Sequence, residues 1–144
     1  MRKFLITIMA VATAICTMAQ DKKAEFNKKL VAAQTDEMAY RLNMTDAQKR
    51  EFSGIYEQYC HEVLSAKIAM DAKKKELTDP IAQEKNRLEK QRKVLDIRIA
   101  YADRFGKVLS GEQLTRLYKE ENQIQKRLKS LLQGAQLERD GSSF

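Results

Sequence analysis

Residues 44–63 read MTDAQKREFSGIYEQYCHEV, and this stretch decides the fold. Thr45 followed three residues later by Gln48 is a capping box, in which each side chain pairs with a backbone N–H that the helix start leaves free. Beyond the box, apolar residues recur at steps of three and four, which is the spacing of one face of a helix. The stretch therefore predicts a long amphipathic helix over residues 46–77.

A second capping box stands further along the chain, where residues 109–113 read LSGEQ. Ser110 takes the cap position and Gln113 the third helical position. This box predicts a helix over residues 111–133, with Gly134 as its end. The box residues of both motifs are expected to organise the fold rather than to bind a partner, because capping accounts for their chemistry.

A third helix start lies at Asp79, which can cap a helix whose first residue is Pro80. It predicts a helix over residues 80–108, and a further helix over 23–42 precedes the first box. Pro80 is the only proline of the chain, and no segment alternates polar and apolar residues over the length of a strand. The sequence therefore predicts an all-α fold of four helices in an extended, hairpin-like arrangement.

One apolar stripe of the helix over 80–108 repeats every seven residues, a period typical of antiparallel or coiled-coil-like packing. We expect this stripe to be buried against the neighbouring helices. It consists of Ile81, Leu88, Leu95, Ala102 and Leu109.

A second stripe of the same helix mixes cations with apolar side chains and lies away from the first. It consists of Arg87, Lys90, Val94, Ile97, Arg98 and Tyr101. We expect this face to bind unfolded, partly acidic polypeptides, because its cations attract acidic segments at range while its apolar side chains bury against them. The alternative is that Val94, Ile97 and Tyr101 form a dimer contact and the cations are its solvated rim.

The first nineteen residues have the pattern of a cleavable signal peptide. Arg2 and Lys3 precede an uncharged apolar run over 4–15, and a cleavage site of small residues ends at Ala19. A membrane-spanning helix needs about twenty consecutive apolar residues, so this run is too short to be one. A lipid-carrying Cys16 is the alternative, but a bulky residue precedes it where a small one is expected. We therefore predict export.

The exported part is expected to be one helical domain over residues 20–134 with a flexible tail over 135–144. The whole chain has a formal net charge of +7. Such a charge in a cytoplasmic protein would favour nucleic acid as the partner, but export leaves anionic membranes and acidic or unfolded polypeptides. Cys60 is the one cysteine after the signal peptide, so it can form a disulfide only with another molecule.

No metal site, cofactor or enzymatic activity is predicted. Cys60 and His61 are adjacent and point about 100° apart on a helix, so they do not readily chelate one ion. Glu57, one turn before His61, adds one ligand, whereas a structural zinc site needs four. The chain has no G-x-S-x-G, no phosphate-binding glycine loop and no HExxH.

The two boxes, the signal peptide and the helical pattern together resemble the Spy/CpxP family of bacterial periplasmic proteins, which carries two LTxxQ motifs. Residues 44–48 have Met in place of Leu, and residues 109–113 have Ser in place of Thr. The resemblance covers roughly residues 35–130. It implies a periplasmic, antiparallel, cradle-shaped homodimer, which agrees with the expectation that long helices in so short a chain need a second copy to complete their core.

The resemblance also implies a function. The best-known members of the family are ATP-independent chaperones of the envelope stress response, so the expected partners are unfolded or misfolded periplasmic proteins. The first alternative is a regulatory protein that binds the periplasmic domain of a sensor kinase or an anti-sigma factor. The second is a metal-responsive stress protein, because related proteins bind zinc.

Overall fold

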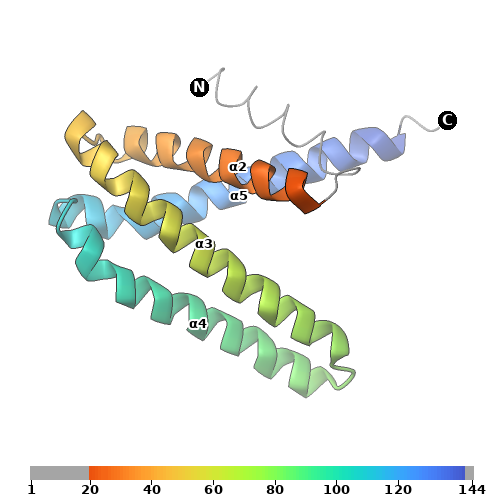
Figure 1. Ribbon diagram of the computed structural model, residues 1–144. Helices are drawn as coiled ribbons and strands as arrows, with labels where there is room; N and C mark the ends of the chain where they lie inside the picture. The colour runs from red at the N-terminus through yellow and green to blue at the C-terminus, as the bar shows by residue number, and fades with distance from the viewer. Residues whose placement is uncertain (1–19, 142–144) are drawn as a thin grey trace. The chain divides into compact units, whose positions relative to one another are not determined.

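The computed structural model describes residues 20–141, with side chains for residues 25–131, 133 and 134. The predicted signal peptide and the last three residues lie outside this range. The described chain consists of four helices and no strand, which confirms the all-α prediction (Figure 1). The helices are α2 (Gln20–Arg41), α3 (Asp46–Glu76), α4 (Pro80–Gly106) and α5 (Gly111–Gly141).

The chain divides into two compact units. The hairpin unit is Ala47–Leu114 and contains nearly all of α3, the whole of α4 and the start of α5. The terminal unit is the described part of Met1–Asp46 and Thr115–Phe144, which contains α2 and most of α5.

The end of α2 is set by Asn43, the one non-glycine residue of the described chain with a positive φ, at 50°. The N–H of Met44 bonds to the carbonyl of Ala39 at 3.0 Å, and that of Asn43 to the carbonyl of Tyr40 at 3.1 Å. These two bonds form a Schellman motif, and asparagine is one of the few side chains that tolerates the left-handed conformation at its turn.

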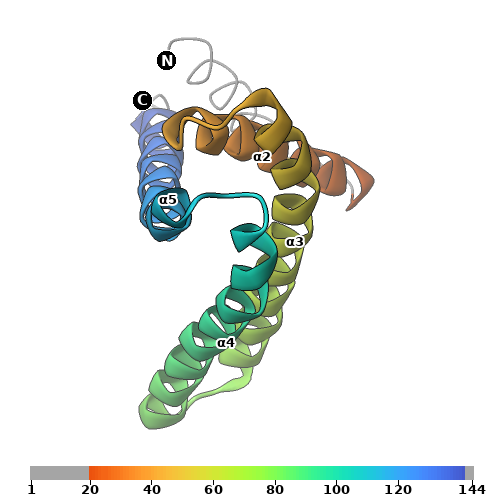
Figure 2. The ribbon, with the colours of Figure 1, turned by 90° about the vertical axis from the view of Figure 1, so that its left-hand side faces the viewer.

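In the hairpin unit α3 and α4 run antiparallel and lie side by side (Figures 1 and 2). Asp79 caps α4 as predicted, because its Oδ2 accepts from the N–H of Ala82 at 2.9 Å and Pro80 is the first helical residue. The connection is closed by Gln83, whose side-chain amide donates to the carbonyl of Leu77 at 2.8 Å. A short, capped connection of this kind makes the two helices antiparallel neighbours.

The fourth helix is longer than predicted. Gly134 does not end it, and α5 continues to Gly141. A glycine inside a helix costs about 1 kcal/mol relative to alanine and does not by itself stop the helix. The residues that follow Gly134 include Ala, Gln, Leu, Glu and Arg, which are good helix formers, and no proline interrupts them.

Five aromatic rings form the core of the hairpin unit. Phe105 of α4 contacts rings of α3, with centroid distances of 5.6 Å to Phe52 and 5.6 Å to Tyr59. Tyr101, one turn before Phe105, lies 5.6 Å from Tyr59 in an edge-to-face arrangement. Tyr56 completes the cluster, stacked 4.9 Å from Phe52. All five side chains are buried, so aromatic volume fills the contact between the two helices.

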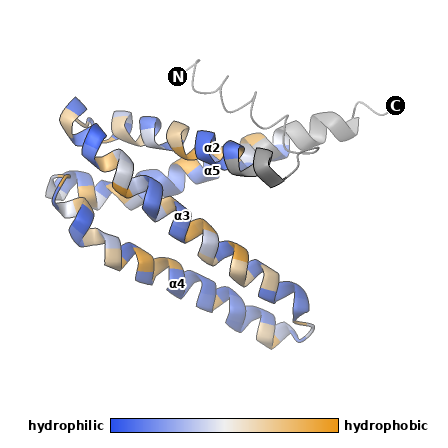
Figure 3. Ribbon diagram, in the orientation of Figure 1, coloured by the Kyte–Doolittle hydropathy of each residue, from blue (hydrophilic) through white to orange (hydrophobic). Residues whose placement is uncertain are grey.

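The predicted buried stripe is open over most of α4. Ile81, Leu88 and Leu95 are 66%, 50% and 53% exposed, so the expectation of burial is wrong for these three. It holds at the other end of the stripe, where Ala102 is half-buried and Leu109, beyond the end of α4, is buried. A helix turns about 100° per residue, which places Tyr101 about 140° and Phe105 about 100° around α4 from the middle of these three residues. The large rings form the contact with α3, and the smaller aliphatic side chains remain exposed (Figure 3 shows hydrophobic residues recurring along α4 among hydrophilic ones).

In the terminal unit the fully buried apolar side chains are Met38 and Leu42 near the end of α2 and Leu117 near the start of α5. Arg41 lies beside them, with its side chain 14% exposed, and pairs with Glu37 at 2.6 Å and Glu120 at 3.0 Å. Arg116 of α5 also lies 3.8 Å from Glu120 and donates to the backbone carbonyl of Arg41 at 2.8 Å. A charge network with two arginines therefore joins α2 to α5.

Candidate binding surfaces

The six residues predicted to bind a partner do not form one open face. Tyr101 is 4% exposed, and its hydroxyl donates to the Glu62 carboxylate on α3 at 2.6 Å. Burial raises the pKa of Tyr101, and the bond to Glu62 raises it further. Val94 and Ile97 are half-buried.

The three cations of that set have partners within the hairpin unit. Lys90 pairs with Asp71 of α3 at 2.5 Å, and this hydrogen bond holds the pKa of Asp71 below its usual value. Arg98 donates to the hydroxyl of Tyr59 at 3.3 Å. Arg87, which is exposed, pairs with Glu84 one turn away at 2.6 Å. Lys90 and Arg98 thus link α4 to α3, and a role of the six residues in binding a partner stays a prediction.

The open face of α4 is the stripe that was expected to be buried. Ile99, 72% exposed, extends it by one turn beyond Leu95, and Lys85 and Arg92 are exposed between its apolar members. Their spacing of three and four residues places all of them on one side of the helix. We call this surface the α4 stripe; it consists of Ile81, Lys85, Leu88, Arg92, Leu95 and Ile99. The heptad repeat in the sequence identified three of its four apolar members but was assigned to the core.

The second capping box is confirmed. The N–H of Gln113 donates to Ser110 Oγ at 3.2 Å, and the N–H of Ser110 donates to Gln113 Oε1 at 2.9 Å. In the first motif, α3 begins at the residue after Thr45.

The two motif glutamines also bond to each other, which the sequence did not predict. The side-chain amide of Gln48 donates to Gln113 Oε1 at 2.9 Å and to the carbonyl of Val108 at 3.0 Å. The amide of Gln113 approaches Gln48 Oε1 at 3.4 Å. The motifs therefore tie the start of α3 to the start of α5 within the hairpin unit, and their matching glutamines were the available signal.

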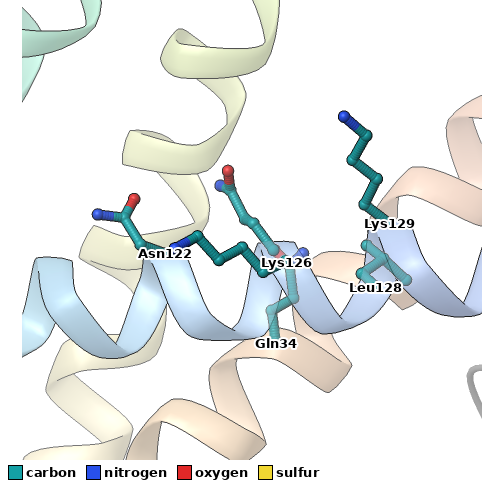
Figure 4. Close-up of a pocket in the computed structure, with 6 residues that line it drawn as sticks. Gln34, Asn122, Lys126, Leu128 and Lys129 are labelled. Atoms are coloured by element: carbon teal, nitrogen blue, oxygen red, sulfur yellow. The ribbon is translucent and has the colours of Figure 1, made fainter.

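A groove of about 550 Å³ lies between α2 and α5 in the terminal unit (Figure 4). Gln34 comes from α2, and the other lining residues come from successive turns of α5. The α5 residues are Asn122, Gln125, Lys126, Leu128 and Lys129. Its volume is in the range of ligand sites, and its lining combines amides, two lysines and one apolar side chain. Sequence reasoning missed this groove, because its walls are far apart in the chain.

A second hollow, of about 490 Å³, lies on α3 in the hairpin unit and is lined by Glu57, His61 and Glu62, among others. These include the residues weighed above as metal ligands, and Cys60 beside them is half-buried. Among the described side chains, no three His, Cys, Asp or Glu residues are grouped so that they could hold a metal ion. The hollow therefore offers two acids and one imidazole on a single helix.

None of the helices that the structure describes is both long and apolar enough to cross a membrane. In comparisons with protein-family models, with curated proteins and with solved structures, nothing matches this chain. We therefore infer its function from the geometry of the two units.

Proposed function

We propose that this protein is an exported, ATP-independent, chaperone-like protein that binds unfolded or partly folded proteins of the cell envelope. The observation that carries the proposal is the α4 stripe. Its four aliphatic side chains are each at least half exposed, and two cations stand between them. An unfolded polypeptide presents apolar side chains to such a surface, and its acidic segments are attracted by the cations.

The exposure of the stripe is suited to reversible binding. Fully burying a leucine or isoleucine side chain is worth about 1.5–3 kcal/mol. Because the members of the stripe are already partly covered by α4 itself, a client gains about 1 kcal/mol from each of them. Four such gains, minus the cost of ordering a flexible client, support weak binding that ends when the client buries its own apolar surface.

The periplasmic location and the homodimer belong to the same proposal. The pattern of residues 1–19 supports export, and the motifs at residues 44–48 and 109–113 support the resemblance to the Spy/CpxP family and hence a cradle-shaped dimer. A second copy that covered the α4 stripe would compete with a client for it. The oligomeric state of each protein therefore has to be measured together with its ability to bind a client.

The test is the suppression of aggregation of a chemically unfolded model protein by the mature chain and by the variant Leu88→Gln/Leu95→Gln. Glutamine is a good helix former, so the exposed substitutions should leave the fold intact. We expect the variant to lose most of the suppression at equal molar concentration. The matched control is Ile68→Gln on α3, because Ile68 is 54% exposed and lies outside the stripe.

Full suppression by the double variant would refute the proposal, and so would an equal loss in the control. Sedimentation of both proteins shows whether the substitutions act on a dimer instead. A wild-type dimer that the double variant converts to a monomer, with suppression unchanged, would assign the stripe to self-association.

A further inference from the structure

The groove between α2 and α5 has the chemistry of a site for acidic polypeptide. Lys126 and Lys129 supply positive charge, and Leu128 supplies an apolar contact (Figure 4). The side-chain amides of Gln34 and Gln125 each carry two donors and an acceptor. Amides of this kind can pair with peptide N–H and C=O groups whatever the sequence of the bound segment.

The α5 wall of the groove carries an excess of positive charge. Residues 121–134 of α5 contain three cations, Lys126, Arg127 and Lys129, and one acid, Glu121, which is buried. Residues 25–36 of α2 contain two lysines and two acids, Glu25 and Asp36. An anionic ligand in this groove is therefore attracted mainly by the cations of α5.

The two lysines stand on one side of α5, because residues three apart on a helix are neighbours. Their charges lie at the ends of flexible side chains, which run in different directions in Figure 4, so they are not held at one spacing. In an extended chain, side chains two residues apart point to the same side. Carboxylates on alternate residues of an extended segment can therefore all face the lysine-bearing side of α5, whereas one of two carboxylates on adjacent residues points away.

We propose that this groove binds extended, acidic polypeptide segments that carry carboxylates on alternate residues. The inference rests on the proposed function and deepens it, because it names a class of client segment and a second place where the client is held. The α4 stripe would take apolar segments and the groove acidic ones.

The experiment measures binding of two fluorescein-labelled peptides to the mature chain by anisotropy. One peptide repeats Glu-Ser and the other repeats Glu-Glu-Ser-Ser, so the two have the same composition and only the first has glutamates two residues apart. We expect the alternating peptide to bind at least about threefold more tightly, and binding to weaken as salt is raised.

The variant Lys126→Glu/Lys129→Glu should lower the affinity for the alternating peptide about tenfold, because two attractions become repulsions. The charge-matched control is Lys93→Glu/Lys119→Glu. Both of its positions are exposed and neither lies in the segments that line the groove, so its affinity should stay within about twofold of wild type. Circular dichroism checks the helical content of each variant. The variant Lys126→Gln/Lys129→Gln removes the two charges without reversing them, so it should weaken binding less.

Equal binding of the two peptides, or equal losses in the two charge-reversal variants, would overturn the inference.

A separate experiment measures binding to vesicles that contain phosphatidylglycerol. Binding to vesicles that depends on Lys126 and Lys129, without binding of either peptide, would assign the groove to lipid headgroups and would also overturn it. Leu88→Gln/Leu95→Gln should bind the peptide like wild type, so failure of the stripe and failure of the groove give different results.

Discussion

The two units of this protein hold their helices together by different means. In the hairpin unit, α3 and α4 meet through a cluster of five aromatic rings, and the aliphatic stripe of α4 is left exposed. In the terminal unit, α2 and α5 are joined by a largely buried arginine between two glutamates, beside a small aliphatic core. In α4, the face that carries the large aromatic side chains is therefore the buried one, and most of the more regular aliphatic repeat is exposed.

The largest expected effect is loss of the aromatic contact. Phe105→Ala should destabilise the protein by about 3–5 kcal/mol, because Phe105 is fully buried among four other rings. Ile99→Ala, at a 72% exposed position of the same helix, should cost less than about 0.5 kcal/mol. Urea unfolding followed by circular dichroism measures both changes. Equal costs would show that the α4 stripe is part of the core.

The next effect concerns the terminal unit. Burial opposes the charge of Arg41, but hydrogen bonds to Glu37 and Glu120 outweigh it and raise the pKa of Arg41. Arg41→Met leaves those two carboxylates without their shared cation, and it should cost about 2 kcal/mol. The control Lys29→Met breaks an exposed pair with Glu25 and should leave the free energy of unfolding unchanged within experimental error.

The same network can be tested by compensation. Adding Glu37→Gln and Glu120→Gln to Arg41→Met should recover about half of the lost stability, because Glu37 has then lost its cation and Glu120 keeps only Arg116, at 3.8 Å. Urea unfolding of the triple variant checks this expectation. A triple variant that is less stable than Arg41→Met alone would contradict the view that charge pairing joins α2 to α5.

A smaller effect is expected at the paired motif glutamines. Gln48→Ala and Gln113→Ala should each cost about 1 kcal/mol, because each loses hydrogen bonds that are partly buried. The double variant should cost less than the sum of the two, because the bond between the two side chains is counted twice. Strict additivity in the double-mutant cycle would show that the two motifs act independently.

The smallest effect is a dependence on pH. The hydrogen bond from Lys90 makes the pKa of Asp71 lower in the folded protein than in the unfolded chain, where it is about 4. The ionised Asp71 therefore stabilises the folded hairpin unit at pH values above about 4. This stabilisation is lost as the pH falls through the pKa of Asp71 in the folded protein. Asp71→Asn should therefore lower the melting temperature slightly at pH 7 and leave it unchanged at pH 2. A difference that persists at pH 2 would contradict the ion pair.

The sequence was sufficient for the features that depend on neighbouring residues. The caps at Asp79 and Ser110 were predicted because a cap needs an oxygen and a backbone N–H only two or three residues away. The end of α5 was not, because Gly134 lowers the stability of a helix without preventing its continuation.

The face of α4 was assigned wrongly for a physical reason. Periodicity shows that a helix has two faces, but the choice between them depends on the rings that α3 presents, and that contact joins residues far apart in the chain. The groove was missed for the same reason, since Gln34 and Lys126 come together only when α2 packs on α5.

The central claim is that the α4 stripe, left open by the aromatic contact, binds unfolded polypeptide. The most direct measurement places a photo-crosslinking amino acid at Leu95 or at Ile68 and irradiates the protein with an unfolded client. We expect strong crosslinks to the client from position 95 and few from position 68, although both positions are about half exposed. Equal crosslinking from the two positions, or crosslinks from position 95 to a second copy alone, would contradict it.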